Sequence, residues 1–363
     1  MLRQHPGQPG HPFQRIPSGP AYTPIPLVEP AQNSIGTIFF VTKTLKENQQ
    51  LNVLEMNDKG QSSSAVTTKT TDPLPEGQYF PSPDGKLVAI IWGTEGGFSG
   101  SLLELKSGKI FPLLGGLPFT FFFNWYPDSQ QALVQNNAGG LWLIDAYGKK
   151  PFNALFSPSL GSVGNAASSP DGSKVIYSFV KDPAQPAEVW SVNSDGRDAA
   201  KLFDTQVPLY GFSWSPNGAQ IAVFGNGLMV MNPDGSNFHT VFNSYPTSSC
   251  DLSGPLWSPD SQKIAITIYE TYSDTLCPGW IGNHFAGTHI AIIDLKSEQF
   301  QIIPFEKDSG DVDPSWSPDG KKITFVSNRN GATNLWVTDL KESKPYPITT
   351  MNEFVRYPSW LKP

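Results

Sequence analysis

The feature that most constrains this chain is a short motif, an aromatic residue followed by Ser-Pro-Asp-Gly or a close variant, which recurs along most of its length. A constant period is typical of repeat architectures in which each unit packs on its neighbours. A truncated seventh copy, ending in Trp360, lies at the C-terminus. The six complete copies have their central prolines at Pro83, Pro127, Pro170, Pro216, Pro259 and Pro318, so the differences between successive numbers are 44, 43, 46, 43 and 59. The single long spacing predicts an insertion.

The motif has the composition of a tight turn between antiparallel strands. Proline fixes φ at the first turn position, Asp or Asn bonds the backbone that follows it, and Gly or Ser completes the connection. The aromatic residue is a flat apolar side chain suited to packing between sheets. Segments rich in β-forming residues follow the motif at 87–91, 175–177, 221–224, 264–266 and 323–326, and second strands follow at 141–145, 189–193, 228–232 and 335–339. With a short third strand, each unit of about 45 residues has the size of a propeller blade, and the motif residues are expected to be structural.

The two ends of the chain complete one another. Residues 36–41 have the character of a strand that follows a motif, but no motif precedes them, and the last motif has no strand behind it. We therefore expect a composite first blade, built from 36–70 and 352–363. With six internal blades this predicts an all-β, seven-bladed β-propeller over residues 36–363, closed by pairing of the C-terminal strand with the N-terminal strands. Such closure leaves no blade with an orphan edge.

The repeated Trp-Ser-Pro-Asp-Gly resembles the TolB-like β-propeller repeat, a variant of the WD40-like blade. The closest match runs over 316–325, Trp-Ser-Pro-Asp-Gly-Lys-Lys-Ile-Thr-Phe, and continues at 327–331 and 334–337. The resemblance covers residues 36–363 and implies the fold. It implies function only weakly, because similar repeats occur in the periplasmic TolB protein, which binds envelope partners, in the propeller that gates prolyl oligopeptidase-type enzymes, and in stand-alone lyases. TolB carries an α/β domain before a six-bladed ring, and this sequence predicts neither.

Composition excludes several classes of protein. The chain has 25 Lys and Arg against 32 Asp and Glu, a net charge of −7, whereas a nucleic-acid binder would show a basic stripe. With 38% hydrophobic residues and no apolar run near the ~18 that a membrane helix needs, we expect a soluble protein without a membrane span. Residues 1–10 show no signal peptide. Residues 1–35, with eight prolines in the first thirty, predict a Pro-rich disordered tail or linker.

The long repeat departs from the others over the insertion at 268–288. Cys250 and Cys277 are the only two cysteines. One lies in the connection that leads into this blade and the other in the connection between its second and third strands, and a propeller places both connections on the same face. A disulfide between them would stabilise the chain by about 3 to 4 kcal/mol and imply an oxidising compartment; the alternative is two free thiols. Candidate ligand-binding residues of the insertion are Tyr269, Tyr272, Trp280, His284 and Phe285. These side chains could equally fold back and pack the insertion itself.

A second group of candidates precedes the motifs, where the innermost strands are expected to open at the mouth of the central channel. The acids Glu76, Asp311 and Asp313 could hold a cation through oxygen ligands, although acids of this kind are more often simply solvated, and we predict neither a metal nor another cofactor. The same alignment gives Gln78, Phe122, Asn165, Tyr210, Ser253 and Arg356. No nucleophile elbow, Walker loop, dinucleotide fingerprint or His-Glu-x-x-His motif is present, so no catalytic residue is predicted.

Two functions from different classes follow from these patterns. The first is a non-catalytic binding or scaffold propeller of the cell envelope or a secreted one, a monomer that recognises a protein, peptide or glycan on the insertion face. The alternative is a small-substrate enzyme, a polysaccharide lyase or a lactonase-like hydrolase, with a site at the channel mouth. Its residues would come from Glu76, Asp311, Asp313, His284 and Arg356. The two hypotheses differ in whether those acids and a histidine meet within ligand distance.

Overall fold

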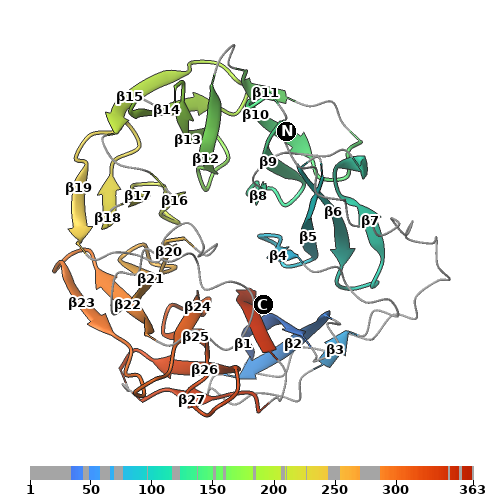
Figure 1. The fold of residues 1–363 in the computed structure, drawn as a ribbon, viewed down its shortest axis with the longest axis vertical. Coiled ribbons are helices and arrows are strands. Elements are labelled where there is room, and N and C mark those ends of the chain that lie inside the picture. Colours follow the sequence, from blue (N-terminus) through green and yellow to red (C-terminus); the bar gives the residue numbers. More distant parts are fainter. Residues whose placement is uncertain are drawn as a thin grey trace, which may run out of the picture.

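The structure is a computed structural model that describes residues 34–43, 49–57, 66–68, 77–95, 97–116, 123–136, 138–149, 153–157, 161–182, 185–205, 209, 211–225, 227–243, 254–269, 287–341, 344–350 and 354–361. The described strands form seven four-stranded sheets. These sheets are arranged as blades around a centre, with one strand of each blade innermost (Figure 1). The fold is the all-β, seven-bladed β-propeller that the repeats predict.

Six blades consist of strands that are consecutive in the chain. Blades 2 to 4 contain, from the centre outward, β4 (Gln78–Pro81), β5 (Leu87–Thr94), β6 (Gly97–Glu104) and β7 (Ile110–Pro112), which the 3-10 helix η1 (Leu113–Gly116) follows; β8 (Phe123–Trp125), β9 (Gln131–Gln135), β10 (Leu141–Asp145) and β11 (Asn153–Phe156); and β12 (Ser162–Ser168), β13 (Lys174–Val180), β14 (Ala187–Asn193) and β15 (Ala200–Thr205). Blades 5 to 7 contain β16 (Gly211–Trp214), β17 (Ile221–Gly225), β18 (Gly227–Met231) and β19 (His239–Phe242); β20 (Leu256–Trp257), β21 (Lys263–Tyr269), β22 (Thr288–Asp294) and β23 (Gln299–Ile302); and β24 (Asp311–Trp316), β25 (Lys322–Ser327), β26 (Asn334–Asp339) and β27 (Tyr346–Pro347).

Blade 1 joins the two ends of the chain. Its strands are, from the centre outward, β28 (Phe354–Leu361), β1 (Ser34–Lys43), β2 (Gln49–Asn57) and β3 (Val66–Thr68). Strand β28 pairs antiparallel with β1, from Lys43 opposite Phe354 to Thr37 opposite Leu361. The predicted closure by the C-terminal strand is therefore confirmed, and the ring has no unpaired edge at the join.

The repeated motif forms the turn between the first and second strands of a blade. In blade 7, the Ser317 hydroxyl lies 2.7 Å from an oxygen of Asp319 and accepts a hydrogen bond from the Lys322 amide at 2.9 Å. The Asp319 carboxylate also accepts from the amide of Lys321. Gly320 has a φ of +69°, a left-handed conformation that a residue without Cβ adopts at little cost. The motif therefore satisfies its own backbone and directs the chain from β24 into β25.

The motif tryptophans join neighbouring blades. Four of the five donate their indole N–H to a backbone carbonyl on the innermost strand of the preceding blade, at 2.8 to 3.2 Å, in addition to packing as the apolar wedge that the sequence predicts. The apolar clusters likewise span pairs of blades, so the core lies between the sheets rather than within one of them. The four donor and acceptor pairs are Trp125 with Phe80, Trp214 with Ala167, Trp257 with Ser213, and Trp316 with Leu256.

Several predicted features lie outside the described residues. They are the Pro-rich segment before Ser34, most of the insertion, and both Cys250 and Cys277, so the disulfide stays a prediction. In the part of the chain that the structure describes, no helix has the length and apolar character needed to cross a bilayer.

Candidate functional site

A cavity of about 520 Å³ lies against the innermost strands of blades 1, 2 and 7, with contributions from blades 3 and 6. These are β28, β4 and β24, together with parts of β8 and β20, and all of them face the centre of the ring (Figure 1). Strands β24 and β28 sit on the two sides of the join between the last repeat and the composite blade. One wall of the cavity is thus β28, the strand that closes the ring by pairing with β1.

An ion pair crosses this join. The Nε of Arg356 donates to Asp313 Oδ2 at 2.8 Å, and Nη2 lies 3.4 Å from Oδ1. The backbone amide of Tyr357 donates to the same Oδ2 at 3.2 Å. The Asp313 side chain is 9% exposed, whereas the Arg356 side chain is 28% exposed, so the guanidinium is the more accessible partner. The sequence placed both residues at the channel mouth, and the structure brings them together.

Asp313 and Tyr357 share an uncommon backbone conformation. Their φ angles are +53° and +55°, and each lies three residues before a motif tryptophan, Trp316 or Trp360. Both strands shift register beside them, β24 against β25 and β28 against β1, as β-bulges do. Left-handed residues other than glycine cost about 1–3 kcal/mol each and cluster at functional sites. Because of the bulges, the backbone at these two residues departs from the alternation of a regular strand.

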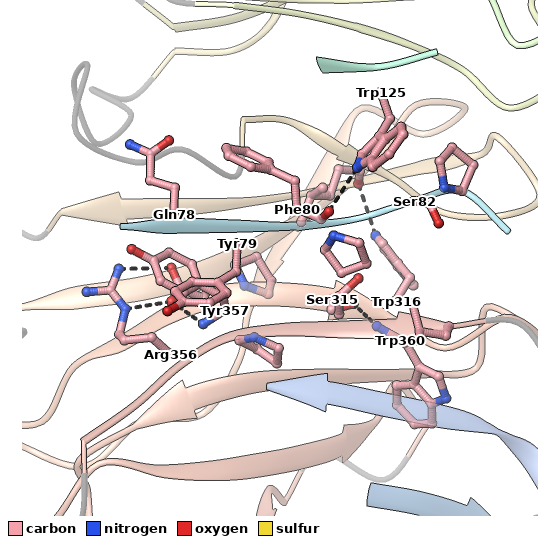
Figure 2. A pocket seen from close by; sticks show the side chains of 18 of the residues that line it. Gln78, Tyr79, Phe80, Ser82, Trp125, Ser315, Trp316, Arg356, Tyr357 and Trp360 are labelled. Atoms are coloured by element: carbon pink, nitrogen blue, oxygen red, sulfur yellow. Dashed lines mark hydrogen bonds and ion pairs between the residues drawn. The ribbon is translucent and has the colours of Figure 1, made fainter. Parts of the chain in front are cut away.

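Aromatic rings support the ion pair from the side. The Arg356 guanidinium carbon lies 5.1 Å from the centre of the Tyr357 ring, and the Tyr357 ring lies 6.2 Å from that of Tyr79 at an angle of 35°. Figure 2 shows the two tyrosine rings against each other with Arg356 beside them. Tyr79 is buried, so this stack fixes the position of the guanidinium instead of offering a free aromatic face.

Asp311 is held in a separate ion pair within blade 7. Nη2 of Arg329 lies 2.7 Å from each of its oxygens, and the two side chains are 0% and 5% exposed. Burial raises the pKa of Asp311, and the charge of Arg329 opposes that rise. Residues two apart on a regular strand share a face, but the bulge between Val312 and Ser315 separates Asp311 from Asp313. Asp311 thus has an arginine of its own and does not line the cavity that Asp313 lines, and it has no exposed surface for a ligand.

The remaining candidates fall into two groups. Gln78 lines the cavity, whereas the Asn165 amide donates to the Leu209 carbonyl at 3.3 Å in blade 4. Tyr269 ends β21 opposite Thr288, and its side chain is not described. Those that lie outside the described residues are Glu76, Phe122, Tyr210, Ser253, Tyr272, Trp280, His284 and Phe285.

Sequence reasoning missed several cavity residues, among them Asn124, Ser315 and Tyr357. A signal for Tyr357 was present, because counting three positions back from the motif tryptophan gives both Asp313 and Tyr357. Among the described residues, no group of three His, Cys, Asp or Glu side chains is placed to hold a metal ion. What this site offers is one charge pair, several neutral polar groups, and an apolar wall.

Comparison with known proteins agrees with the repeat prediction. No family model matches the chain. It is 26% identical over 207 residues, 47% of its length, to dipeptidyl-peptidase 5 of Porphyromonas gingivalis, of which the match covers 30%. It is 34% identical over 74 residues, 20% of its length, to the Tol-Pal system protein TolB of Hydrogenovibrio crunogenus, of which the match covers 17%. The chain thus spans less than a third of either relative.

Among solved structures, oligogalacturonate lyase in complex with manganese has a similar fold. The TM-score is 0.58 at 14% sequence identity, over 87% of this chain and 85% of the other. At that identity the likeness concerns the fold alone. It supports the β-propeller fold that the repeats predict, and the TolB match over 74 residues agrees with the resemblance that the motif carries.

Proposed function

We propose that this chain is a non-catalytic binding propeller that holds a ligand or partner at the cavity between blades 1, 2 and 7. The observation that carries the proposal is that Asp311 and Asp313, the two candidate acids within the described residues, are both held in ion pairs. Each is engaged by an arginine, at 2.7 Å and 2.8 Å respectively. A general base or a metal ligand needs a carboxylate whose lone pairs can reach a proton or an ion. A guanidinium occupies those lone pairs, which favours recognition over chemistry.

The insertion offers a second surface for the same function. Its candidate contacts are Tyr269, Tyr272, Trp280, His284 and Phe285, and its partner would be a protein, a peptide or a glycan. Tyrosine and tryptophan are the usual anchors of such interfaces. We place the protein outside the cytoplasm, in the cell envelope or secreted, as a monomer whose ring closes within one chain. The match to a Tol-Pal system protein supports this location, and a bond between Cys250 and Cys277 would require it.

The test combines binding and turnover on the full chain. Immobilised protein is probed with a peptide library and with uncharged and acidic glycans, and each bound compound is incubated and analysed for products. We expect binding without turnover. The Trp280→Ala variant should lose partners of the insertion face, and the Arg356→Gln variant should lose ligands of the cavity, with circular dichroism confirming that both variants are folded.

The alternative is a polysaccharide lyase or a lactonase-like enzyme whose site would draw on Glu76, His284 and Arg356. The same assay distinguishes it. Cleavage of oligogalacturonate or of a sugar lactone by the wild-type chain, abolished by Arg356→Gln, would establish the enzyme and refute the binding propeller.

A further inference from the structure

The charges that line the cavity cancel. Asp313 and Arg356 are its only charged side chains among the described residues, and they contact each other at 2.8 Å. A bound carboxylate would meet Arg356 only in the company of the Asp313 carboxylate, and the whole chain carries a net charge of −7. A bound cation would meet the guanidinium in the same way. The cavity therefore favours neither sign of charge on its ligand.

Neutral polar groups complement this pair. The side chains of Gln78, Asn124, Ser315 and Ser359 line the same cavity. Gln78 is half-buried and Asn124 is exposed, and neither side-chain amide has a hydrogen-bond partner among the described residues. Each amide offers two donor hydrogens and an acceptor oxygen, and each serine hydroxyl can both donate and accept a hydrogen bond. A ligand that fits must itself both donate and accept hydrogen bonds along its edge.

The walls between these groups are apolar. Half-buried Phe80 and Pro81 lie on β4, and Pro314 and Pro358 occupy corresponding stretches of β24 and β28. Figure 2 shows Phe80 on the same strand as Gln78 and Tyr79, with Ser315 across the cavity. Flat C–H surfaces flanked by hydroxyl and amide groups match a molecule with apolar faces and a polar edge. At about 520 Å³ the cavity has the volume of a small-molecule site.

We propose that the ligand of this cavity is an uncharged saccharide, of mono- or disaccharide size. A sugar ring has C–H faces and a rim of hydroxyl groups that donate and accept, and it carries no charge. This inference rests on the proposed function, binding without turnover, and names the ligand class for that site. It departs from the acidic saccharide after which the structurally similar oligogalacturonate lyase is named.

The test is isothermal titration of the full chain with maltose, cellobiose and N,N′-diacetylchitobiose as uncharged probes and with digalacturonate as the acidic one. We expect at least one uncharged probe to bind more tightly than digalacturonate. Gln78→Ala and Asn124→Ala should each weaken that binding about fivefold, the loss of one hydrogen bond. Neither side chain holds the ring together, so both variants should fold. Gln301→Ala, an exposed amide on the outer strand β23, is the matched control and should change nothing.

Three results would overturn the saccharide: binding of none of the three uncharged probes, tighter binding of digalacturonate, or binding that the cavity variants leave unchanged. The proposed function fails in a different way, through the appearance of cleavage products from a bound probe in chromatography of the same mixtures. A peptide that binds at Arg356 and is recovered intact would overturn the saccharide and leave the binding propeller standing.

Discussion

Five of the seven joints between blades carry a motif tryptophan, and these five are of two kinds. At four of them, between blades 2 and 3, 4 and 5, 5 and 6, and 6 and 7, a motif indole donates to a backbone carbonyl of the preceding blade. At the join between blades 7 and 1, Trp360 occupies the corresponding place, but its indole nitrogen has no hydrogen-bond partner among the described residues. That join is held by Asp313 and Arg356 instead.

Other polar contacts reinforce the join between blades 7 and 1. The amide of Trp360 donates to the Ser315 hydroxyl at 2.9 Å, and the amide of Val355 donates to the Thr333 hydroxyl at 3.1 Å. As at the other joints, the chain runs from the outer strand of one blade, β27, into the innermost strand of the next, β28, so these contacts add to a covalent connection. The N-terminal and C-terminal strands meet instead inside blade 1, where β28 pairs with β1. Strand β28, which closes the ring through its pairing with β1, also lines the cavity.

The largest effect should come from removing the wedge of a regular joint. Trp316 is buried between blades 6 and 7, and Trp316→Ala should lower the free energy of unfolding by about 3–5 kcal/mol through lost burial and a residual cavity. Urea denaturation followed by fluorescence measures it. Trp360→Ala should cost a similar amount, because Trp360 is equally buried. A decrease in the free energy of unfolding of less than about 1 kcal/mol at either site would mean that the tryptophan contributes little to the stability of that joint.

The next prediction concerns the ion pair between Asp311 and Arg329 inside blade 7, which is more deeply buried than the pair across the join. Asp311→Ala leaves the buried Arg329 without its carboxylate, and should cost about 3 kcal/mol. The low end of the usual range applies because Arg329 keeps the Ser327 hydroxyl and the Pro304 carbonyl. The double variant Asp311→Ala with Arg329→Met should recover part of the loss. No recovery would show that the cost comes from packing and not from an unpaired charge.

The fold was predictable from the sequence because it repeats. Seven copies of one motif, read with the strands after them, gave the blade count, and the predicted second strand at 141–145 coincides with β10. The site was less predictable, since it depends on departures from the repeat. Asp311 and Asp313 were expected to share a mouth, and they would do so on a regular strand. The structure holds them in two different ion pairs, and the left-handed conformation of Asp313 leaves no mark on the hydrophobic periodicity.

A smaller effect is expected at the ion pair between Asp313 and Arg356. Arg356 is 28% exposed, so solvent screens its attraction to Asp313, and Asp313→Ala should cost about 1 kcal/mol. The change should be local. Hydrogen exchange should speed up at the amides of β28, among them that of Tyr357, and stay unchanged in β16 and β17 of blade 5. Equally faster hydrogen exchange in all blades would contradict an ion pair whose effect is confined to the join between blades 7 and 1.

The smallest effect tests the difference between the two kinds of joint directly. Phenylalanine keeps most of the apolar wedge and removes the indole N–H. Trp316→Phe should therefore leave the Leu256 carbonyl without its donor and cost about 1 kcal/mol for that hydrogen bond, in addition to the lost ring volume. Trp360→Phe should lose the volume alone, because its indole has no partner among the described residues.

The informative quantity is the difference between the two variants in the free energy of unfolding, since the change in ring volume is common to both. We expect Trp316→Phe to be the less stable by about 1 kcal/mol, the usual net value of one hydrogen bond. Equal losses would mean that the indole bonds add nothing to the regular joints. The join between blades 7 and 1 would then differ from the other four only in the ion pair between Asp313 and Arg356.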